Sequence, residues 1–286
     1  NIQSTINSFE PITLDEMNSV ALMKRTDTKF IINVSELHII LEEIKKTYRV
    51  LEIEDKRIMN YSSLYFDTPN FKFYNDHHNG RVNRTKIRQR KYVDSDLNFL
   101  EIKQKNGKGE TNKSRIKIDD FETDLTDKSK TFIETTIKNK LELIPSLWNN
   151  FKRITLVNLK DSERVTIDLD LTYSLEAAKK SYSGIVVIEL KQSRFDRTSI
   201  VAKTLKKYSY NPYSISKYCI GIVNLYKDLK YNLIILASAE EECSGDNGIA
   251  SIIPIIPKID FAIIGELSLM KMAIAERGVI VFDIKI

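Results

Sequence analysis

The residues best suited to chemistry lie between positions 84 and 90, which read Arg-Thr-Lys-Ile-Arg-Gln-Arg. Successive side chains of a strand point to opposite faces, and neighbours on one face lie about 7 Å apart. One face of this stretch would therefore carry four cations, Arg84, Lys86, Arg88 and Arg90. Cations at that spacing repel one another unless water or an anion neutralises them. For one isolated strand, a solvated outer face would explain the pattern.

The same alternation of charged and aliphatic residues recurs along the chain, which favours a site over one solvated strand. The predicted strands cover residues 25–32, 62–67, 84–92, 99–105, 113–118, 152–158, 163–173 and 184–191. Short turns join the three strands between 84 and 118, so we expect an antiparallel meander there. In the strand 163–173 the alternation is unbroken, and it places Asp168 and Asp170 on the face of Arg164.

Apolar spacing and capping signals predict the helices. A capping box at Thr13–Glu16 begins a short helix, and Ser35 would cap a second one, whose buried stripe starts at Leu37. The polar segment 75–83 is expected to be a loop. Further helices are expected at 127–143, 196–208 and 217–228.

Two architectures satisfy these strands. In an open sheet, helices cover the aliphatic face and water wets the charged one. In a closed antiparallel β-barrel of about eight strands, an α+β fold, the aliphatic faces point outward under helices and the charged faces line a tunnel. The tunnel would then hold Arg25, Lys29, Arg88, Arg90, Lys103, Lys105, Lys113, Arg115, Arg153, Arg164 and Lys191.

Such a tunnel requires an anion, because each buried like charge costs several kcal/mol. A linear polyanion would satisfy it, since arginine forks and lysine ammonium groups pair with phosphate oxygens along a chain. Carboxylates on the same faces oppose phosphate binding unless a divalent metal intervenes. These carboxylates are Glu101, Asp168, Asp170 and Glu189.

Composition agrees with an anionic partner. Residues 231–286 hold four of the 44 lysines and arginines and eight of the 39 acidic residues, so they carry −4 and residues 1–230 carry +9. Positive charge is the usual footprint of an anionic ligand. The cysteines Cys219 and Cys243 form neither a metal motif nor a disulfide framework, which favours a reducing, cytoplasmic compartment. No apolar run reaches the roughly 18 residues of a spanning helix.

Nine short motifs, in order, resemble the triphosphate tunnel metalloenzymes of the CYTH-like superfamily, and within them the VTC-type polyphosphate polymerase domain. They are Arg25 and Lys29 in KRTDTKF, SLYFDT from Ser63, Arg88 with Arg90, EIK from Glu101, KSRIK from Lys113, Phe151 with Arg153, RVTIDLDL from Arg164, IELK from Ile188, and SKY from Ser216.

The resemblance implies a tunnel that binds ATP together with Mn²⁺ or Mg²⁺. In family terms the tunnel cations would hold the triphosphate and the growing chain, and Lys217 would lie at the exit. Glu189 would bind the metal, with Glu101 as a second candidate, and Phe151 would stack on the base. The implied reaction transfers the γ-phosphoryl group of ATP to inorganic polyphosphate and releases ADP. On this basis we expect Arg88→Ala or Arg90→Ala to abolish binding without loss of stability.

One departure from the superfamily pattern bears on the reaction. Hydrolytic and cyclase members carry Glu-x-Glu-x-Lys on the first strand, where this chain has Arg25, Asp27 and Lys29. An arginine in place of the first carboxylate favours the polymerase over a metal-dependent inorganic or nucleoside triphosphatase, which stays open as an alternative. A nucleic-acid-binding module is a further alternative, although only Tyr92 and Phe99 lie near the basic strands to stack on bases.

We therefore expect two parts, a catalytic tunnel domain at 1–230 and a C-terminal extension at 231–286 of unknown role. The extension has aliphatic stretches, so a membrane-protein partner is left open beside simple core packing. The expected ligands are ATP and polyphosphate, and no nucleic acid is expected. The expected location is cytoplasmic, with membrane association through a partner left open.

Overall fold

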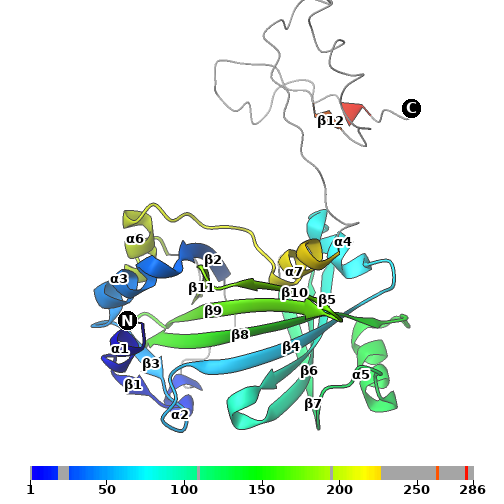
Figure 1. The fold of residues 1–286 in the computed structure, drawn as a ribbon, viewed down its shortest axis with the longest axis horizontal. Coiled ribbons are helices and arrows are strands. Elements are labelled where there is room, and N and C mark those ends of the chain that lie inside the picture. The colour runs from blue at the N-terminus through cyan, green and yellow to red at the C-terminus, as the bar shows by residue number, and fades with distance from the viewer. Residues whose placement is uncertain are drawn as a thin grey trace, which may run out of the picture. The chain divides into compact units, whose positions relative to one another are not determined.

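The computed structural model describes residues 2–18, 26–107, 110–193 and 196–226, and two short strands, β12 (Ala262–Ile263) and β13 (Val281–Phe282), which pair antiparallel. Contacts between Cα atoms divide the chain into two units, Asn1–Lys230 and Tyr231–Ile286. Figure 1 shows the ribbon. Within the described residues, no helix has the length and apolar character needed to cross a membrane.

An 11-stranded sheet forms the first unit, with its main path in the order β2-β11-β9-β8-β4-β5-β6-β7. All pairs are antiparallel except β1 with β3, and the predicted meander of β5, β6 and β7 is confirmed. The strands are β1 (Pro11–Ile12), β2 (Thr26–Asn33), β3 (Arg49–Leu51), β4 (Met59–Asp67), β5 (Arg84–Tyr92), β6 (Leu97–Lys105), β7 (Thr111–Ile118), β8 (Ile144–Asn158), β9 (Glu163–Leu175), β10 (Ala178–Tyr182) and β11 (Ile185–Gln192).

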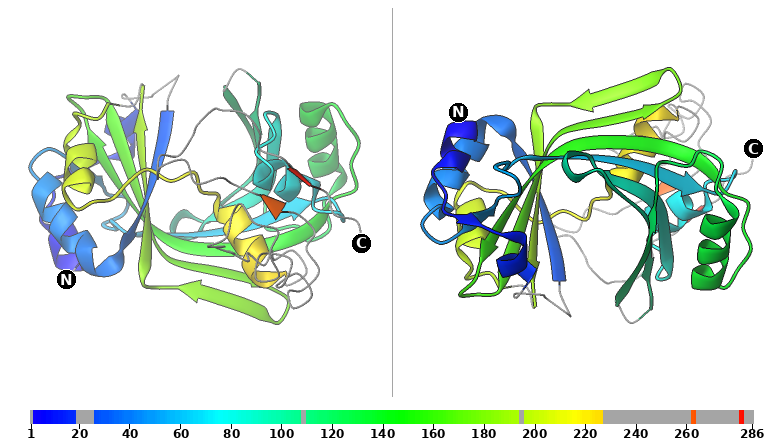
Figure 2. Two further views of the ribbon diagram at one scale, coloured as in Figure 1. Left: turned by 90° about the horizontal axis from the view of Figure 1, so that it is seen from above. Right: turned by 90° about the horizontal axis from the view of Figure 1, so that it is seen from below.

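The sheet is mostly antiparallel and the fold is α+β, as predicted, but the predicted closed barrel is wrong. Among the described strands, no hydrogen-bonded ladder joins the two ends of the path, β2 and β7. β7 is largely exposed and carries Lys113, Arg115 and Lys117, and charged side chains on an edge strand disfavour further pairing. The sheet curves strongly instead (Figure 2), and Lys103 Nζ of β6 lies 3.9 Å from Asp27 Oδ2 of β2.

A β-bulge in β8 and β9 breaks the alternation that the sequence predicts to be continuous. Lys152 pairs with Leu169 and Asn150 with Thr172, and Asp170 between them has φ of 52°. The extra residue reverses the faces beyond it. Asp170 therefore leaves the face of Asp168 and pairs at 3.0 Å with Lys152, both of them half exposed.

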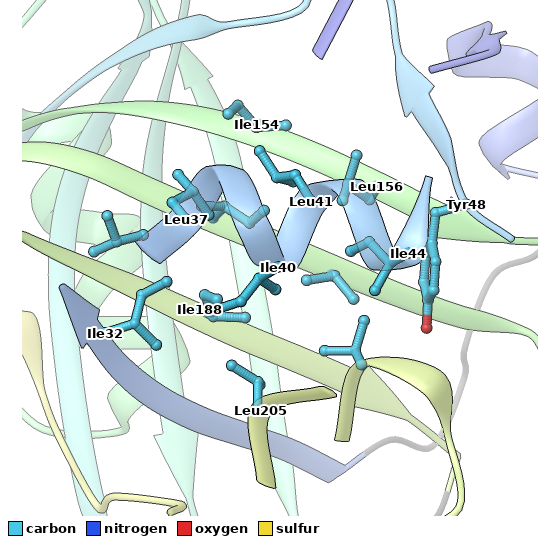
Figure 3. Packing of buried hydrophobic residues seen from close by; sticks show 14 of the residues in the cluster. Ile32, Leu37, Ile40, Leu41, Ile44, Tyr48, Ile154, Leu156, Ile188 and Leu205 are labelled. Atoms are coloured by element: carbon cyan, nitrogen blue, oxygen red, sulfur yellow. The ribbon is translucent and has the colours of Figure 1, made fainter. Parts of the chain in front are cut away.

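Helices cover the aliphatic outer face of β2, β11, β9 and β8. They are α1 (Ile2–Asn7), α3 (Val34–Ile44) and α6 (Ile200–Lys207), and Figure 3 shows α3 pressing Leu37, Ile40, Leu41 and Ile44 onto the strands. The buried stripe of α3 agrees with the prediction, but the residue that caps the helix does not. Asn33, not Ser35, is the N-cap, because its side-chain oxygen Oδ1 accepts from Ser35 N at 3.0 Å.

The other helices differ from expectation mainly at their ends. They are α2 (Leu14–Asn18), α4 (Lys72–His78), the 3₁₀ turn η1 (Val93–Ser95), α5 (Asp127–Ile137) and α7 (Lys217–Leu225). The capping box of α2 is confirmed, since Thr13 N donates to Glu16 Oε2 at 2.9 Å. α4 occupies part of the segment predicted as a loop, because the buried carboxylate of Asp67 accepts from Phe73 N and Tyr74 N and caps it.

α7 packs on the inner face of the sheet, although helices were expected only outside. Tyr218 and Ile222 of this helix are buried against Leu147, Leu171 and other apolar residues at the centre of the sheet. The close approach requires a glycine, because a Cβ at Gly221 would lie 2.4 Å from Leu147 Cδ2 and 2.6 Å from Tyr173 Cδ1.

The substitution Gly221→Ala should therefore destabilise the protein by about 1–3 kcal/mol, the usual cost of overpacking. Gly184→Ala is the matched control, because a Cβ there meets nothing within 4 Å. Urea unfolding of both variants measures the difference. Equal stability of the two would contradict the close packing of α7.

Candidate phosphate-binding site

The inner, concave surface of the curved sheet carries the predicted cations, and we call it the cationic face. Strand register places Arg88 opposite Glu101, and Lys86 opposite Lys103, which in turn is opposite Lys113. The other charged cross-strand neighbours on this face include Lys29 with Glu189, Asp27 with Lys191, and Arg153 with Asp168.

Asp168 anchors one half of the cationic face. Arg153 donates to both of its oxygens, from Nε at 2.6 Å and from Nη2 at 2.8 Å, and Lys217 Nζ also donates to Oδ2. The carboxyl group is fully buried, and burial alone would raise its pKa. The attraction of Arg153 and Lys217 outweighs burial and holds the pKa of Asp168 below its usual range. Asp168 is therefore an ion at neutral pH, and it fixes two predicted phosphate-binding cations in place.

Glu101 does the same in the other half. Arg88 donates to its Oε2 from Nε at 2.9 Å and from Nη2 at 2.7 Å, and Lys113 Nζ donates to Oε1 at 2.5 Å. Burial opposes ionisation, but Arg88 and other nearby cations hold the pKa of Glu101 below its usual range. Both oxygens thus serve cations, so a metal ion at Glu101 would have to displace Arg88 or Lys113.

Glu189 is the more accessible of the two predicted metal ligands, with 15% of its side chain exposed against 2% for Glu101. Lys191 donates to Glu189 at 2.6 Å. Burial disfavours the carboxylate, yet Lys191 and Lys29 keep the pKa of Glu189 well below its ordinary value. Across the described residues no three acidic, histidine or cysteine side chains gather as a ligand set. A divalent ion would fit only if substrate phosphates completed its shell, as they often do for Mg²⁺.

Several lysines of the cationic face are short of counter-charge. Burial, with a contribution from Lys29, lowers the pKa of Lys86 to about 7. Burial also lowers the pKa of Lys113 and of Lys191 to about 8 in spite of their carboxylate partners, and it lowers that of Lys103. An anion bound among these side chains would raise each pKa again, so the cationic face is poised to accept negative charge.

Arg90 is held by uncharged groups. Only 6% exposed, it donates from Nε to Ser63 Oγ at 3.2 Å, and its guanidinium lies 5.6 Å from the ring centres of Tyr61 and Phe151. Burial and the neighbouring Arg88 lower the pKa of Arg90. Its charge is therefore the least compensated among Arg88, Arg90 and Arg153.

Phe151 is buried beneath these cations, with only 3% of the residue exposed. Its ring stacks on Tyr61 at 5.2 Å with an interplanar angle of 4°, and Arg153 and Lys217 each lie 5.2 Å from its centre. An aromatic row continues from Tyr61 to Tyr92 at 5.1 Å and from Tyr92 to Phe99 at 5.9 Å. Stacking of a base on Phe151 stays a prediction, and the less buried Tyr61 and Tyr92 offer neighbouring rings.

The remaining predicted residues lie at the margins. Lys105 and Arg115 are exposed near the β7 edge, with the Arg115 guanidinium 4.7 Å above the Phe99 ring. Arg164, at the start of β9, donates to the carbonyl of Met17 at 3.4 Å. Lys29 donates to the carbonyl of Ile215 at 3.0 Å. Arg25 lies outside the described residues.

Sequence reasoning left three contributors out of the predicted set. Lys86 belongs to it, since its Nζ donates at 3.0 Å to Ser216 Oγ, the N-cap of α7. The alternation in 84–90 contained this signal. The other two contributors are tyrosines. The hydroxyl of Tyr65 accepts from Arg88 at 3.3 Å, and the hydroxyl of Tyr218 donates to Asp67 Oδ2 at 2.5 Å. Both contacts join segments that are distant in the sequence, which the periodicity of residue types does not reveal.

A sequence model described as the VTC domain matches residues 24–226, most of the chain. The chain belongs to the VTC domain family. No curated protein sequence matches this VTC protein. Its family membership therefore depends on the domain match.

Similar solved structures include a Vibrio parahaemolyticus protein described as a candidate adenylate cyclase, with 12% identity, a TM-score of 0.41, and coverage of 72% of this chain and 96% of that one. A Hippeastrum protein described as a candidate adenylyl cyclase with a dominant triphosphatase activity has 13% identity, a TM-score of 0.42, and coverage of 69% and 94%. A Pyrococcus horikoshii protein has 12% identity, a TM-score of 0.39, and coverage of 72% and 99%.

The substitution Asp168→Asn should cost roughly 3–5 kcal/mol, because it leaves two buried cations without a counter-ion. Asp170→Asn is the control, since its ion pair is half exposed and such pairs contribute about 0–1 kcal/mol. Urea unfolding measures both. Tripolyphosphate should stabilise Asp168→Asn more than the unaltered protein. A loss no larger than that of Asp170→Asn would contradict the anchoring role.

The affinity for tripolyphosphate should fall as the pH rises from about 7 to 9. The native pKa of Lys86 is about 7, below its value in an unfolded chain, so above pH 7 the free protein must take up a proton to bind an anion. Each neutral lysine that must be protonated weakens binding up to tenfold per pH unit. Titration calorimetry in buffers of different ionisation enthalpy counts the protons.

Lys86→Arg should flatten this profile, because arginine stays charged, and Lys152→Arg on the outer face should not. Without ligand, the same linkage predicts that stability rises with pH above about 7, where the unfolded chain binds more protons than the native one. A profile that Lys86→Arg leaves unchanged would contradict the assignment.

Proposed function

We propose that this VTC protein is an ATP–polyphosphate phosphotransferase, which moves the γ-phosphoryl group of ATP to the end of a polyphosphate chain and releases ADP. The observation that carries the proposal is the pairing on the cationic face. Asp168 and Glu101 form ion pairs with Arg153 and Arg88, whereas the charges of Arg90 and the lysines are only partly neutralised. The cationic face is therefore better suited to binding a long anion than to activating a water molecule for hydrolysis.

Phosphoryl transfer demands alignment and charge neutralisation more than covalent chemistry from the protein. Arg153 is oriented by a bidentate ion pair with both oxygens of Asp168, and Arg88 by two hydrogen bonds to one oxygen of Glu101. Two hydrogen bonds fix a guanidinium more firmly than a single contact does. The two arginines would orient the phosphates, and Lys86, Lys113 and Lys191 would neutralise charge along the chain. When bound, a divalent ion would be held by Glu189 and would neutralise charge on the phosphates.

The aromatic row supports a nucleoside triphosphate as donor. It lies beside Arg90 and Arg153, which are both within 6 Å of aromatic ring centres. Base–aromatic stacking contributes about 1–3 kcal/mol and tolerates different bases. We infer that the base rests at this end, against Phe151 or its neighbours Tyr61 and Tyr92, while the phosphates extend toward the lysines.

A metal-dependent triphosphatase is the second candidate, and Asp27 favours it. Asp27 lies opposite Lys191 and Glu189 lies opposite Lys29, so the two carboxylates are diagonal neighbours on β2 and β11. Two carboxylates that share a metal with phosphates are a common hydrolytic arrangement. The same cationic face would then bind a triphosphate for attack by water.

Incubation with ATP and Mn²⁺ distinguishes the two reactions. The proposal predicts ADP with an acid-labile phosphate polymer, whereas orthophosphate without polymer would establish the triphosphatase instead. Glu189→Gln should lower metal-dependent turnover by at least tenfold with a smaller effect on nucleotide affinity, because it removes the metal ligand and leaves the cations. Glu142→Gln, at an exposed position, is the control.

A further inference from the structure

A cavity of about 400 Å³ lies beside the cationic face, at the start of β5, the end of β6 and the start of β7. Side chains of α4 close one side, and Ile137 with Leu141 from the end of α5 and the following loop close another. Because Phe73, Ile137 and Leu141 belong to the apolar cluster under the outer face, the cavity is on the outer side of the strand ends. None of the site residues discussed above lines it except Lys105.

The chemistry of the cavity is that of an anion site. Its charged lining residues are Arg84, Lys105 and the pair formed by Lys72 and Asp76, whose ion pair measures 2.5 Å. The Nε atom of Arg84 is buried and has no hydrogen-bond partner. The amide side chains in the lining are Asn83, Gln104, Asn106, Asn112 and Asn139. Asn106 already donates to Glu110 at 2.9 Å. The amide N–H groups of the other four side chains add neutral donors to this net positive charge.

The cavity continues the cationic ladder. Arg84 is opposite Lys105 in the register of β5 and β6, and the next pair on the same face is Lys86 opposite Lys103. A chain that lies along the lysines of the cationic face would meet Arg84 and Lys105 next. The two residues thus connect the inner face with the cavity around the strand ends.

We infer that this cavity is a second docking site for linear polyphosphate, separate from the triphosphate site. The inference rests on the proposed function, which supplies the polymer. A long chain engages the cavity and the cationic face together, so it gains affinity from the second contact without a change at the first. A triphosphate, which is short, occupies the cationic face alone.

The double substitution Asn112→Asp with Asn139→Asp tests the site. Both residues are exposed, so their replacement should leave the fold intact, and the two new carboxylates would repel an anion in the cavity. At physiological salt, calorimetric titration of the full chain should show long-chain polyphosphate binding weakened about tenfold, the loss of about 1.4 kcal/mol. Tripolyphosphate binding should change less than about twofold, because Asn112 lies on the opposite face of β7 from Lys113 and water and salt weaken interactions of exposed charges.

The control Asn7→Asp with Asn33→Asp makes the same charge change on α1 and at the cap of α3, on the far side of the unit (Figure 1). Arg84→Gln should weaken long-chain binding in the same selective way. Equal losses for long and short phosphates, unchanged long-chain binding, or an equal loss for an RNA oligomer would each overturn the inference. If the unaltered protein fails to bind tripolyphosphate, the proposed function falls, while a selective long-chain loss would still support the cavity.

Discussion

The structure depends on how buried positive charge is balanced on the concave side of one sheet. Arginines and lysines from β2, β5, β6, β7, β8, β11 and α7 converge there, and isolated buried cations would destabilise the fold. Asp168 and Glu101 neutralise much of this charge, since each of them forms ion pairs with two cations. The balance is incomplete, however, since burial still lowers the pKa of Lys86 to about 7 and of Lys191 to about 8. An unfinished charge balance of this kind stabilises a fold and at the same time creates affinity for an anion.

α7 connects this electrostatic arrangement to the packing of the domain. Lys217, its first residue, contacts Asp168, and its cap Ser216 accepts from Lys86, so the helix joins both halves of the cationic face. Tyr218 in the same turn donates to Asp67, whose carboxylate also accepts from the first backbone N–H groups of α4. A helix packed on the inner face therefore takes over part of the role that strand pairing would have in a closed barrel. The absence of a ladder between β2 and β7 in the described sheet is compatible with a site, because Lys103 of β6 lies near Asp27 of β2, and α7 with its cap contacts β5 and β9.

The periodicity of residue types predicted the structural features that depend on residues close together in the sequence. Eight of the strands, the meander from Arg84 to Ile118 and the stripe of α3 follow from alternation or helical spacing. The short strands β1, β3 and β10 and the first half of β8 were not predicted. The bulge at Asp170 was not predicted either, because a residue of positive φ leaves no mark on the pattern of residue types. The prediction of a closed barrel was wrong for a similar reason. Alternation determines which face of the sheet a side chain takes, but not how far the sheet curves. The sequence also led us to expect that Arg88→Ala abolishes binding without loss of stability. The ion pair between Arg88 and Glu101 instead predicts a loss of stability, because Glu101 would be left buried with less counter-charge.

The most direct test of the account is a crystal structure with tripolyphosphate and Mn²⁺ bound. The account predicts phosphate oxygens within hydrogen-bond distance of Arg88, Arg90 and Arg153, with the metal between Glu189 and the phosphates. Tripolyphosphate bound away from the concave side, with Arg88 and Arg153 contacting only Glu101 and Asp168, would contradict it.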